Sequence, residues 1–307
     1  MTRVAAFDCG TNTIKLLVAD LDPAAGTEHE LVREMRMVRL GQDVDRTGRF
    51  ADEALERTFA AVDEYAAVVA AHDVEAIRFC ATSAARDAGN GADFAAGVEE
   101  RLGVRPEVVT GDEEAQLSYD GATRGLAGGD LPAPFLVVDI GGGSTELILG
   151  DGHGHVRSAR SLDIGSVRMT ERHLRSDPPT RDEIASAAGE ITAAVATSGV
   201  PLGEARTVIG VAGTITTVAA GVLDLEEYDR SAIDRSVLSL ADVHSLTERL
   251  LAMTVEERRG LPYMHPGRAD VIGAGALILD EVLRRTSVDS LLVSEADILD
   301  GIAWSVA

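Results

Sequence analysis

Two short segments of the chain combine the residue types that bind phosphate. They are Asp8-Cys-Gly-Thr-Asn-Thr and Asp139-Ile-Gly-Gly-Gly-Ser. In each, an aspartate ends an apolar run, glycine follows two residues later, and hydroxyl or amide side chains sit on the turn. Glycine lets backbone N–H groups approach an anion closely, and the small polar side chains add hydrogen-bond donors. We refer to residues 8–15 as the first hairpin and to residues 139–146 as the second hairpin.

One such turn is also typical of an ordinary tight hairpin. The interpretation as a phosphate site therefore depends on the presence of two copies. The two copies lie 131 residues apart in matching contexts. The common alternatives do not fit. A Walker loop needs Gly-Lys followed by Ser or Thr, a Rossmann turn must open a helix, and no Gly-x-Ser-x-Gly elbow occurs. The pattern therefore predicts a duplicated phosphate-binding hairpin.

The elements around each hairpin repeat in the same order. The first half predicts strands over 4–7, 14–21 and within 28–40, then a helix over 51–71, a strand over 75–80, a helix from 83, a strand over 107–109 and a helix from 112. Thr110 and Glu113 match a capping box at that last helix. The breaker-rich stretch 125–134 predicts a joint between domains 1–125 and 126–307.

After the joint the strand–strand–strand–helix order returns. Strands are expected over 135–138, 147–149 and 155–162, and a helix over 167–174. Further helices are expected over 181–197, from 215, over 240–252, over 268–284 and from 296, with strands over 207–211 and 290–293. The terminal helix, about 296–307, is expected to pack back on the first domain.

Composition excludes several classes of partner. The net charge is −23, which should repel nucleic acid and anionic membranes. No apolar run approaches the roughly 18 residues of a membrane span, and the N-terminus shows no signal peptide. With only two cysteines, reduced thiols and a cytoplasmic location are expected. Of the 28 basic residues only Lys15 is a lysine.

A set of ordered motifs extends nearly from end to end of the chain. In order they are DCGTNTIKLL from residue 8, ATSAARDAGN from 81, TGDEEA from 110, VDIGGGSTEL from 138, SLDIGSVRMTE from 161, GVAGTITT from 210, RADVI from 268 and SEADI from 294. The chain resembles the exopolyphosphatase / guanosine pentaphosphate phosphohydrolase family. That family belongs to the superfamily of actin, sugar kinases and heat-shock chaperone ATPases.

The resemblance implies an α/β fold. Two related lobes carry ribonuclease H-like mixed sheets flanked by helices, with an active-site cleft between the lobes. It implies that Glu114, the glutamate before the small residue of the Glu-Glu-Ala motif, is the general base that activates water. Carboxylates in a first helical turn otherwise serve the helix dipole, a role left to Glu113.

The resemblance also implies the groups that bind substrate and metal. Mg²⁺ or Mn²⁺ is expected at Asp8, Asp139 and Glu146. Phosphate binding is expected from Gly10, Thr11, Asn12, Thr13, Lys15, Arg86, Gly141, Gly142, Gly143, Ser144, Arg168, Gly213 and Thr214. Alternatives stay open for three of these: a surface salt bridge for Arg86, a structural role for Lys15, and a plain strand-to-helix turn at Gly213-Thr214.

Residues 157–175 form a basic segment in this acidic chain. Its five arginines oppose only Asp163 and Glu171, a local balance of +3. This balance predicts either a dock for a polyphosphate tail or a solvated helix face.

These observations predict an exopolyphosphatase, which releases orthophosphate from the end of inorganic polyphosphate. The match ends near Ala307, without the additional C-terminal domains of longer family members, which implies short chains as substrates. The alternatives are hydrolysis of guanosine pentaphosphate, a sensor that binds guanosine tetraphosphate, and an actin-like switch or kinase. A homodimer is left open.

Overall fold

The computed structural model describes residues 1–126 and 129–307. The chain divides into two compact units. Unit 1 comprises residues 1–121 and 298–307, and unit 2 comprises residues 122–297. The predicted joint, 125–134, includes residues 127 and 128, which lie outside the described residues.

Unit 1 is a mixed five-stranded sheet with the order β3-β2-β1-β4-β5. Its strands are β1 (Thr2–Cys9), β2 (Thr13–Asp22), β3 (Thr27–Met37), β4 (Ala76–Ala81) and β5 (Glu107–Val108). Its helices are α1 (Val44–Thr47), α2 (Asp52–Ala70), α3 (Ser83–Asp87), α4 (Gly91–Leu102), α5 (Gly111–Arg124) and α13 (Ile298–Trp304).

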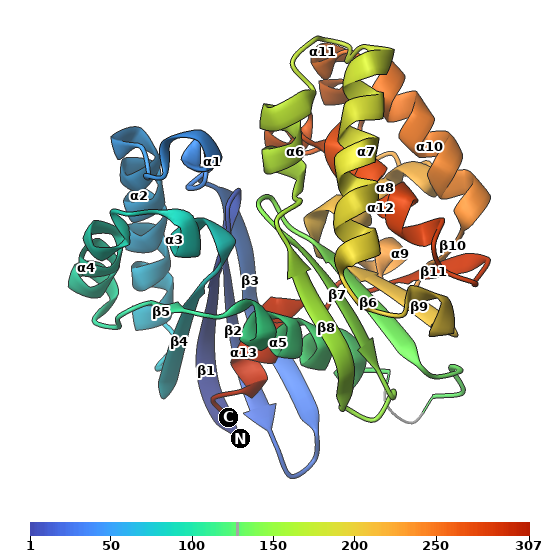
Figure 1. Cartoon of the computed structure of the whole chain (residues 1–307). Helices are drawn as coiled ribbons and strands as arrows, with labels where there is room; N and C mark the ends of the chain where they lie inside the picture. Colours follow the sequence, from blue (N-terminus) through green and yellow to red (C-terminus); the bar gives the residue numbers. More distant parts are fainter. Residues whose placement is uncertain (127–128) are drawn as a thin grey trace. The chain divides into compact units, whose positions relative to one another are not determined.

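Successive side chains of β1 point alternately into two separate hydrophobic cores of unit 1. Phe7 faces the core that lies under α2 and α4, whereas Val4 and Ala6 face the core shared with Ile302 of α13. Side chains alternate between the two faces of a strand, so a strand that is apolar at every position is buried on both sides. The C-terminal helix α13 thus covers the face of β1, β2 and β4 opposite α2 (Figure 1).

Unit 2 is a mixed six-stranded sheet with the order β10-β11-β9-β6-β7-β8. Its strands are β6 (Phe135–Ile140), β7 (Thr145–Gly150), β8 (Val156–Leu162), β9 (Thr207–Val211), β10 (Val237–Ser239) and β11 (Ser290–Val293). Its helices are α6 (Ser166–His173), α7 (Arg181–Thr197), α8 (Ala212–Val222), α9 (Arg230–Ile233), α10 (Leu240–Ala252), α11 (Val255–Arg259) and α12 (Ile272–Leu283), with single 3-10 turns at Leu202–Glu204 and Pro266–Arg268.

The two sheets share one topology. The order β3-β2-β1-β4-β5 in unit 1 corresponds to β8-β7-β6-β9-β11 in unit 2, which adds the edge strand β10. In both, the first three strands are antiparallel neighbours, and the central strand pairs in parallel with the next one. The predicted fold class, two related mixed sheets flanked by helices, is confirmed.

Several predicted boundaries shift, for local reasons. The helix expected from 268 begins only at Ile272, because Pro266–Arg268 form a separate 3-10 turn. The helix expected from 215 already begins at Ala212. The short elements β10, α1, α9 and α11 were not predicted, since segments of three to five residues carry little periodicity.

The predicted capping box at the start of α5 is only half formed. Thr110 Oγ1 accepts from the N–H of Glu113 at 3.2 Å, but the Glu113 carboxylate pairs with Arg78. A complete box is present instead at α7, between Thr180 and Glu183.

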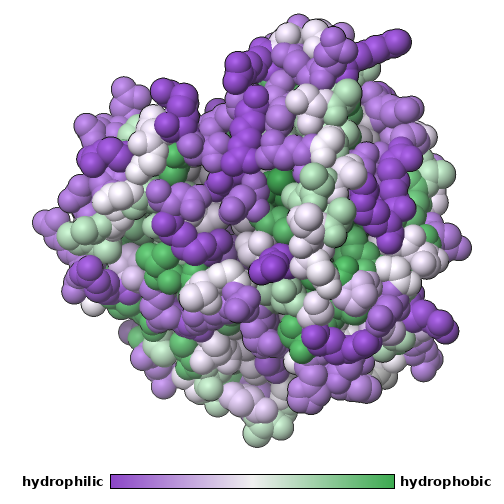
Figure 2. Space-filling model, viewed as in Figure 1, coloured by the Kyte–Doolittle hydropathy of each residue, from purple (hydrophilic) through white to green (hydrophobic). Residues whose placement is uncertain are grey.

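The hydrophilic character of the surface agrees with the chain's net charge of −23. The face drawn in Figure 2 is mostly hydrophilic, with apolar residues in small patches. Among the described residues, no helix combines the length and apolar character that crossing a bilayer requires.

Candidate active site

The first hairpin joins β1 to β2 in unit 1. The pairing register sets Asp8 opposite Lys15, and the Lys15 ammonium lies 3.1 Å from the Asp8 carboxylate. The N–H of Gly10 donates to the Thr13 carbonyl at 2.9 Å and closes the turn. Because the two side chains are largely buried, this ion pair offsets the cost of taking Asp8 out of water.

The second hairpin joins β6 to β7 in unit 2 and has the same closure. The N–H of Gly141 donates to the Ser144 carbonyl at 3.0 Å. Asp139, however, lies opposite Glu146 instead of a lysine. These two carboxylates are only 6% and 2% exposed, and Ser161 Oγ donates to Glu146 Oε1 at 2.7 Å.

Glu114 and Arg86 contact each other in unit 1. Glu114 lies in the first turn of α5 and is 6% exposed. Arg86, at the end of α3, donates from Nη1 to Glu114 Oε2 at 2.6 Å and to the Val109 carbonyl at 3.0 Å. Arg86 thus forms an ion pair with Glu114, a partner other than the neighbouring Asp87 of the salt-bridge alternative. The guanidinium instead holds the carboxylate that the sequence singles out for catalysis.

A hydrogen bond connects α3 to the first hairpin. The hydroxyls of Thr11 and Ser83 lie 3.1 Å apart, and Ser83 opens α3. Arg86 ends the same helix three residues later. The turn of the first hairpin, Arg86 and Glu114 thus form one connected group within unit 1.

The Gly213 turn in unit 2 holds an arginine that sequence reasoning did not assign to the site. A Cβ on Gly213 would overlap the guanidinium of Arg268, whose Nη1 donates to Thr217 Oγ1 at 3.2 Å. Burial lowers the pKa of Arg268. The preceding residue, Ala212, adopts a φ of 67°, a left-handed conformation that a non-glycine residue rarely takes. Arg268 opens the motif RADVI, and that motif was its only signal in the sequence.

A partly exposed tyrosine extends the polar contacts around Arg268. Tyr228 donates to Glu295 Oε1 and contacts Thr216 Oγ1, both at 2.7 Å. Burial, followed by the Glu295 charge, raises the pKa of Tyr228. A polar network therefore lies beside the Gly213-Thr214 turn, and phosphate binding by the turn stays a prediction.

Two of the five arginines in the basic segment 157–175 pair with acids from other parts of unit 2. Arg157 pairs with Glu204 at 2.9 Å, and Arg172 and His173 both pair with Glu190. The dock for a polyphosphate tail, predicted from the charges within the segment alone, stays a prediction. Arg168, whose side chain was also predicted to bind phosphate, lies in the first turn of α6.

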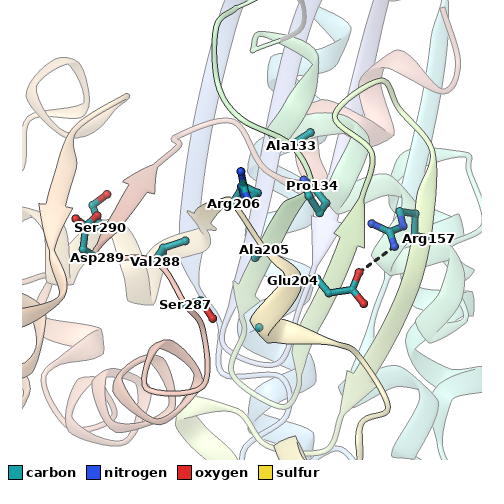
Figure 3. A pocket seen from close by; sticks show the side chains of 11 residues that line it. Ala133, Pro134, Arg157, Glu204, Ala205, Arg206, Ser287, Val288, Asp289 and Ser290 are labelled. Atoms are coloured by element: carbon teal, nitrogen blue, oxygen red, sulfur yellow. Dashed lines mark hydrogen bonds and ion pairs between the residues drawn. The ribbon is translucent and has the colours of Figure 1, made fainter.

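An open cavity of about 790 Å³ lies elsewhere in unit 2 (Figure 3). It is located where β6, β9 and β11 begin, whereas the second hairpin and the Gly213 turn follow the ends of β6 and β9. Its lining mixes Arg157 and Arg206 with Glu204 and Asp289. This balanced charge gives the cavity no attraction for a polyanion, so the hairpins remain the candidate site.

The predicted site residues fall into two sets, one in each unit. Unit 1 holds Asp8, Gly10, Thr11, Asn12, Thr13, Lys15, Arg86 and Glu114, and unit 2 holds Asp139, Gly141, Gly142, Gly143, Ser144, Glu146, Arg168, Gly213 and Thr214. Across the described part of the chain, no group of three or more His, Cys, Asp or Glu side chains is arranged to hold a metal.

Each of the two related sheets carries a Gly-containing hairpin between its first two strands. This duplication is typical of a class of phosphate-handling proteins. Comparison with known proteins identifies the family. The family model described as "Ppx/GppA phosphatase family" matches residues 18–307. The chain belongs to the Ppx/GppA phosphatase family.

Individual relatives agree with this assignment over the whole length of the chain. A Mycobacterium tuberculosis protein named exopolyphosphatase 2 is 49% identical and covers 100% of this chain, with 99% of that protein covered. The crystal structure of an exopolyphosphatase-like protein superposes with a TM-score of 0.95 at 48% identity, covering 99% of this chain and 97% of that one. An Aquifex aeolicus family member gives a TM-score of 0.83 at 30% identity, with 99% and 97% covered.

Proposed function

We propose that this phosphatase is an exopolyphosphatase, which converts polyphosphate of n units and water into polyphosphate of n−1 units and orthophosphate. The observation that carries the proposal is the full-length match, at 49% identity, to a protein named exopolyphosphatase 2. The buried Glu114–Arg86 pair beside the first hairpin supports it with suitable chemistry.

In the proposed step, Glu114 acts as the general base. A water oxygen attacks the terminal phosphorus while its proton passes to the Glu114 carboxylate. The bond from that phosphorus to the bridging oxygen breaks, and the shortened chain keeps the electron pair on that oxygen. Arg86 holds Glu114 in position and brings a positive charge to the site where phosphoryl oxygens gather.

Phosphoryl transfer depends mainly on positioning and charge neutralisation, and both hairpins offer donors for this. The proposed phosphate-binding groups are the backbone N–H groups and polar side chains of the two turns. We assign them to Gly10, Thr11, Asn12, Thr13, Gly141, Gly142, Gly143 and Ser144, with Gly213, Thr214 and Arg168 as further candidates.

A divalent cation fits the second hairpin. Asp139 and Glu146 present hard oxygen ligands from facing positions of one β-ladder, which is the donor chemistry that Mg²⁺ prefers. When bound there, the ion would neutralise phosphate charge and orient the substrate. We propose Mg²⁺ or Mn²⁺ at these two residues. Asp8 as a ligand stays a prediction, and its ion pair with Lys15 argues against direct coordination.

Hydrolysis of guanosine pentaphosphate is the second candidate, because the name of the matched family covers both activities. The same hairpins and the same glutamate would serve, since each substrate ends in a phosphoanhydride. Inorganic polyphosphate as substrate, guanosine tetraphosphate as a possible ligand and a cytoplasmic location all remain proposals.

The test is a direct assay of orthophosphate release with Mg²⁺. Polyphosphates of defined length and guanosine pentaphosphate are supplied at equal concentrations of chain ends. We expect kcat/KM to be highest on polyphosphate. A preference for guanosine pentaphosphate of tenfold or more would move the assignment to the second candidate. Release from neither substrate would reject both.

A further inference from the structure

Two carbonyl groups of the second hairpin, those of Gly141 and Gly142, are turned toward one helix. The Gly141 carbonyl accepts from the N–H of Ser166 at 2.9 Å. The Gly142 carbonyl accepts from the N–H groups of Val167 at 2.9 Å and Arg168 at 3.1 Å. These three donors form the first turn of α6, where N–H groups have no partner within the helix (Figure 1).

This arrangement determines where the hairpin N–H groups point. In a trans peptide the C=O and N–H of one plane point in opposite directions. When the carbonyls of Gly141 and Gly142 face α6, the N–H groups of Gly142 and Gly143 face away from it. Within the part of the chain that the structure describes, neither N–H donates to an acceptor. The turn therefore presents donors on its outer side, the arrangement that binds an anion.

Gly165 is what allows α6 to approach so closely. A Cβ at this position would overlap the carbonyl oxygen of Gly142 and lie 2.6 Å from the carbonyl carbon of Gly143. Gly165 itself has φ −141° and ψ 166°, an extended conformation open to any residue. The requirement for glycine at 165 is thus steric, and it comes from the hairpin.

The first hairpin has a related arrangement, built from a different segment and shifted by one residue along the turn. The Thr11 carbonyl accepts from the N–H of Gly41 at 2.8 Å, and the Asn12 carbonyl accepts from Val38 at 3.0 Å and Arg39 at 2.9 Å. A Cβ on Gly41 would overlap the Thr11 side chain.

The donors in unit 1 come from the irregular segment after β3, whereas those in unit 2 open a helix after β8. In both units two adjacent hairpin carbonyls accept three N–H groups from the segment after the third strand, although the accepting positions lie one residue further along the turn in unit 1.

We infer that residues 165–168 and 38–41 are positioning segments. Each binds the carbonyls of its phosphate hairpin and so directs the hairpin N–H groups toward substrate, and Gly165 is the positioning residue on which the second one depends. The inference rests on the proposed function, because the substrate is taken to be a phosphate chain.

The first test is Gly165→Ala, with Gly189→Ala as the matched control. Gly189 lies in α7 of the same unit, and a Cβ there meets nothing within 4 Å. We expect Gly165→Ala to raise KM for polyphosphate about tenfold and to lower kcat, because a displacement of about 1 Å in a binding group has effects of this size or larger. Gly189→Ala should retain wild-type kinetics. A smaller folded fraction would lower the apparent kcat but leave KM unchanged, so KM separates positioning from folding.

In case Gly165→Ala does not fold, the second test removes the hydrogen bonds that the Ser166 N–H and hydroxyl donate to the Gly141 carbonyl. Ser166→Pro deletes the N–H donated to Gly141 at the first position of α6, where proline is well tolerated. Arg181→Pro is its control at the first position of α7, because the Arg181 N–H has no acceptor among the described residues. We expect KM to rise at least fivefold, an effect of the size that losing well-placed donors produces, in Ser166→Pro only.

Folded variants with KM within twofold of wild type would overturn the inference while leaving the proposed function intact. If the wild-type enzyme in the same assay released no orthophosphate, the proposed function would fail instead.

Discussion

The two hairpins have the same backbone and opposite charge patterns. Both close with an N–H···O=C bond of about the same length, 2.9 Å at Gly10 and 3.0 Å at Gly141. Both begin with an aspartate at the same place in the ladder. Opposite that aspartate stands Lys15 in the first hairpin and Glu146 in the second. One hairpin carries its own counter-charge, whereas the other places two buried carboxylates face to face.

This difference indicates how a duplicated element can be divided between two tasks. Like charges opposite each other on a β-ladder destabilise it, and a buried carboxylate needs a compensating partner. A divalent cation would supply that compensation at Asp139 and Glu146. At the first hairpin the Lys15 ammonium already supplies it, so this hairpin can bind phosphate through its turn without a metal. The two hairpins share the backbone hydrogen bond that closes the turn, and they differ in the residue that faces the aspartate.

Of the changes at the two hairpins, the largest is expected from removing one carboxylate of the acidic pair in the second hairpin. Glu146→Gln keeps the size of the side chain and removes one of the two facing charges. We expect orthophosphate release to fall about 100-fold or more, since a bound metal contributes several kcal/mol to such reactions. Titration with Mg²⁺ should require far higher concentrations to reach the residual rate.

Glu227→Gln is the matched control for this change, because Glu227 is an exposed glutamate of the same unit. An unchanged rate and an unchanged Mg²⁺ requirement in Glu146→Gln would show that the second hairpin does not hold the metal.

A smaller effect, on stability, is expected at the first hairpin. Lys15→Met removes the ammonium and leaves the Asp8 carboxylate, whose side chain is only 8% exposed, without this partner. We expect a loss of about 3 kcal/mol in the free energy of unfolding of unit 1. Urea unfolding followed by tryptophan fluorescence measures it, because the single tryptophan, Trp304, lies in unit 1.

The double variant Asp8→Asn, Lys15→Met sharpens this test. If the two side chains stabilise the hairpin through each other, the double variant recovers most of the lost stability. Additive losses would mean that Lys15 acts elsewhere, and the proposed contrast between the hairpins would lose its basis.

Much of the fold follows from short-range patterns in the sequence. The repeated order of strands and the apolar strands before each aspartate predict the paired sheets, because side-chain alternation and turn chemistry act over a few residues. The return of the terminal helix to the first half of the chain came from the family resemblance, and α13 does pack on β1, β2 and β4.

The contacts that complete the site depend on residues far apart in sequence. Arg86 contacts Glu114 across 28 positions, and Arg268 reaches the N-terminal turn of α8 from the 3-10 turn before α12. The charge balance of the basic segment also depends on distant residues, since Glu190 and Glu204 come from outside it. No pattern of spacing within a segment contains this information, because only the tertiary fold brings these charges together.

The central claim, that Glu114 activates water in a phosphate-hydrolysing site, is tested most directly by Glu114→Gln. Orthophosphate release from polyphosphate should fall by about 100-fold to 10,000-fold, the range that general-base catalysis contributes. Binding of polyphosphate, measured by calorimetry on the same preparation, should remain within a few-fold of wild type. A variant that still hydrolyses polyphosphate at a rate near wild type would contradict the account and remove Glu114 from the mechanism.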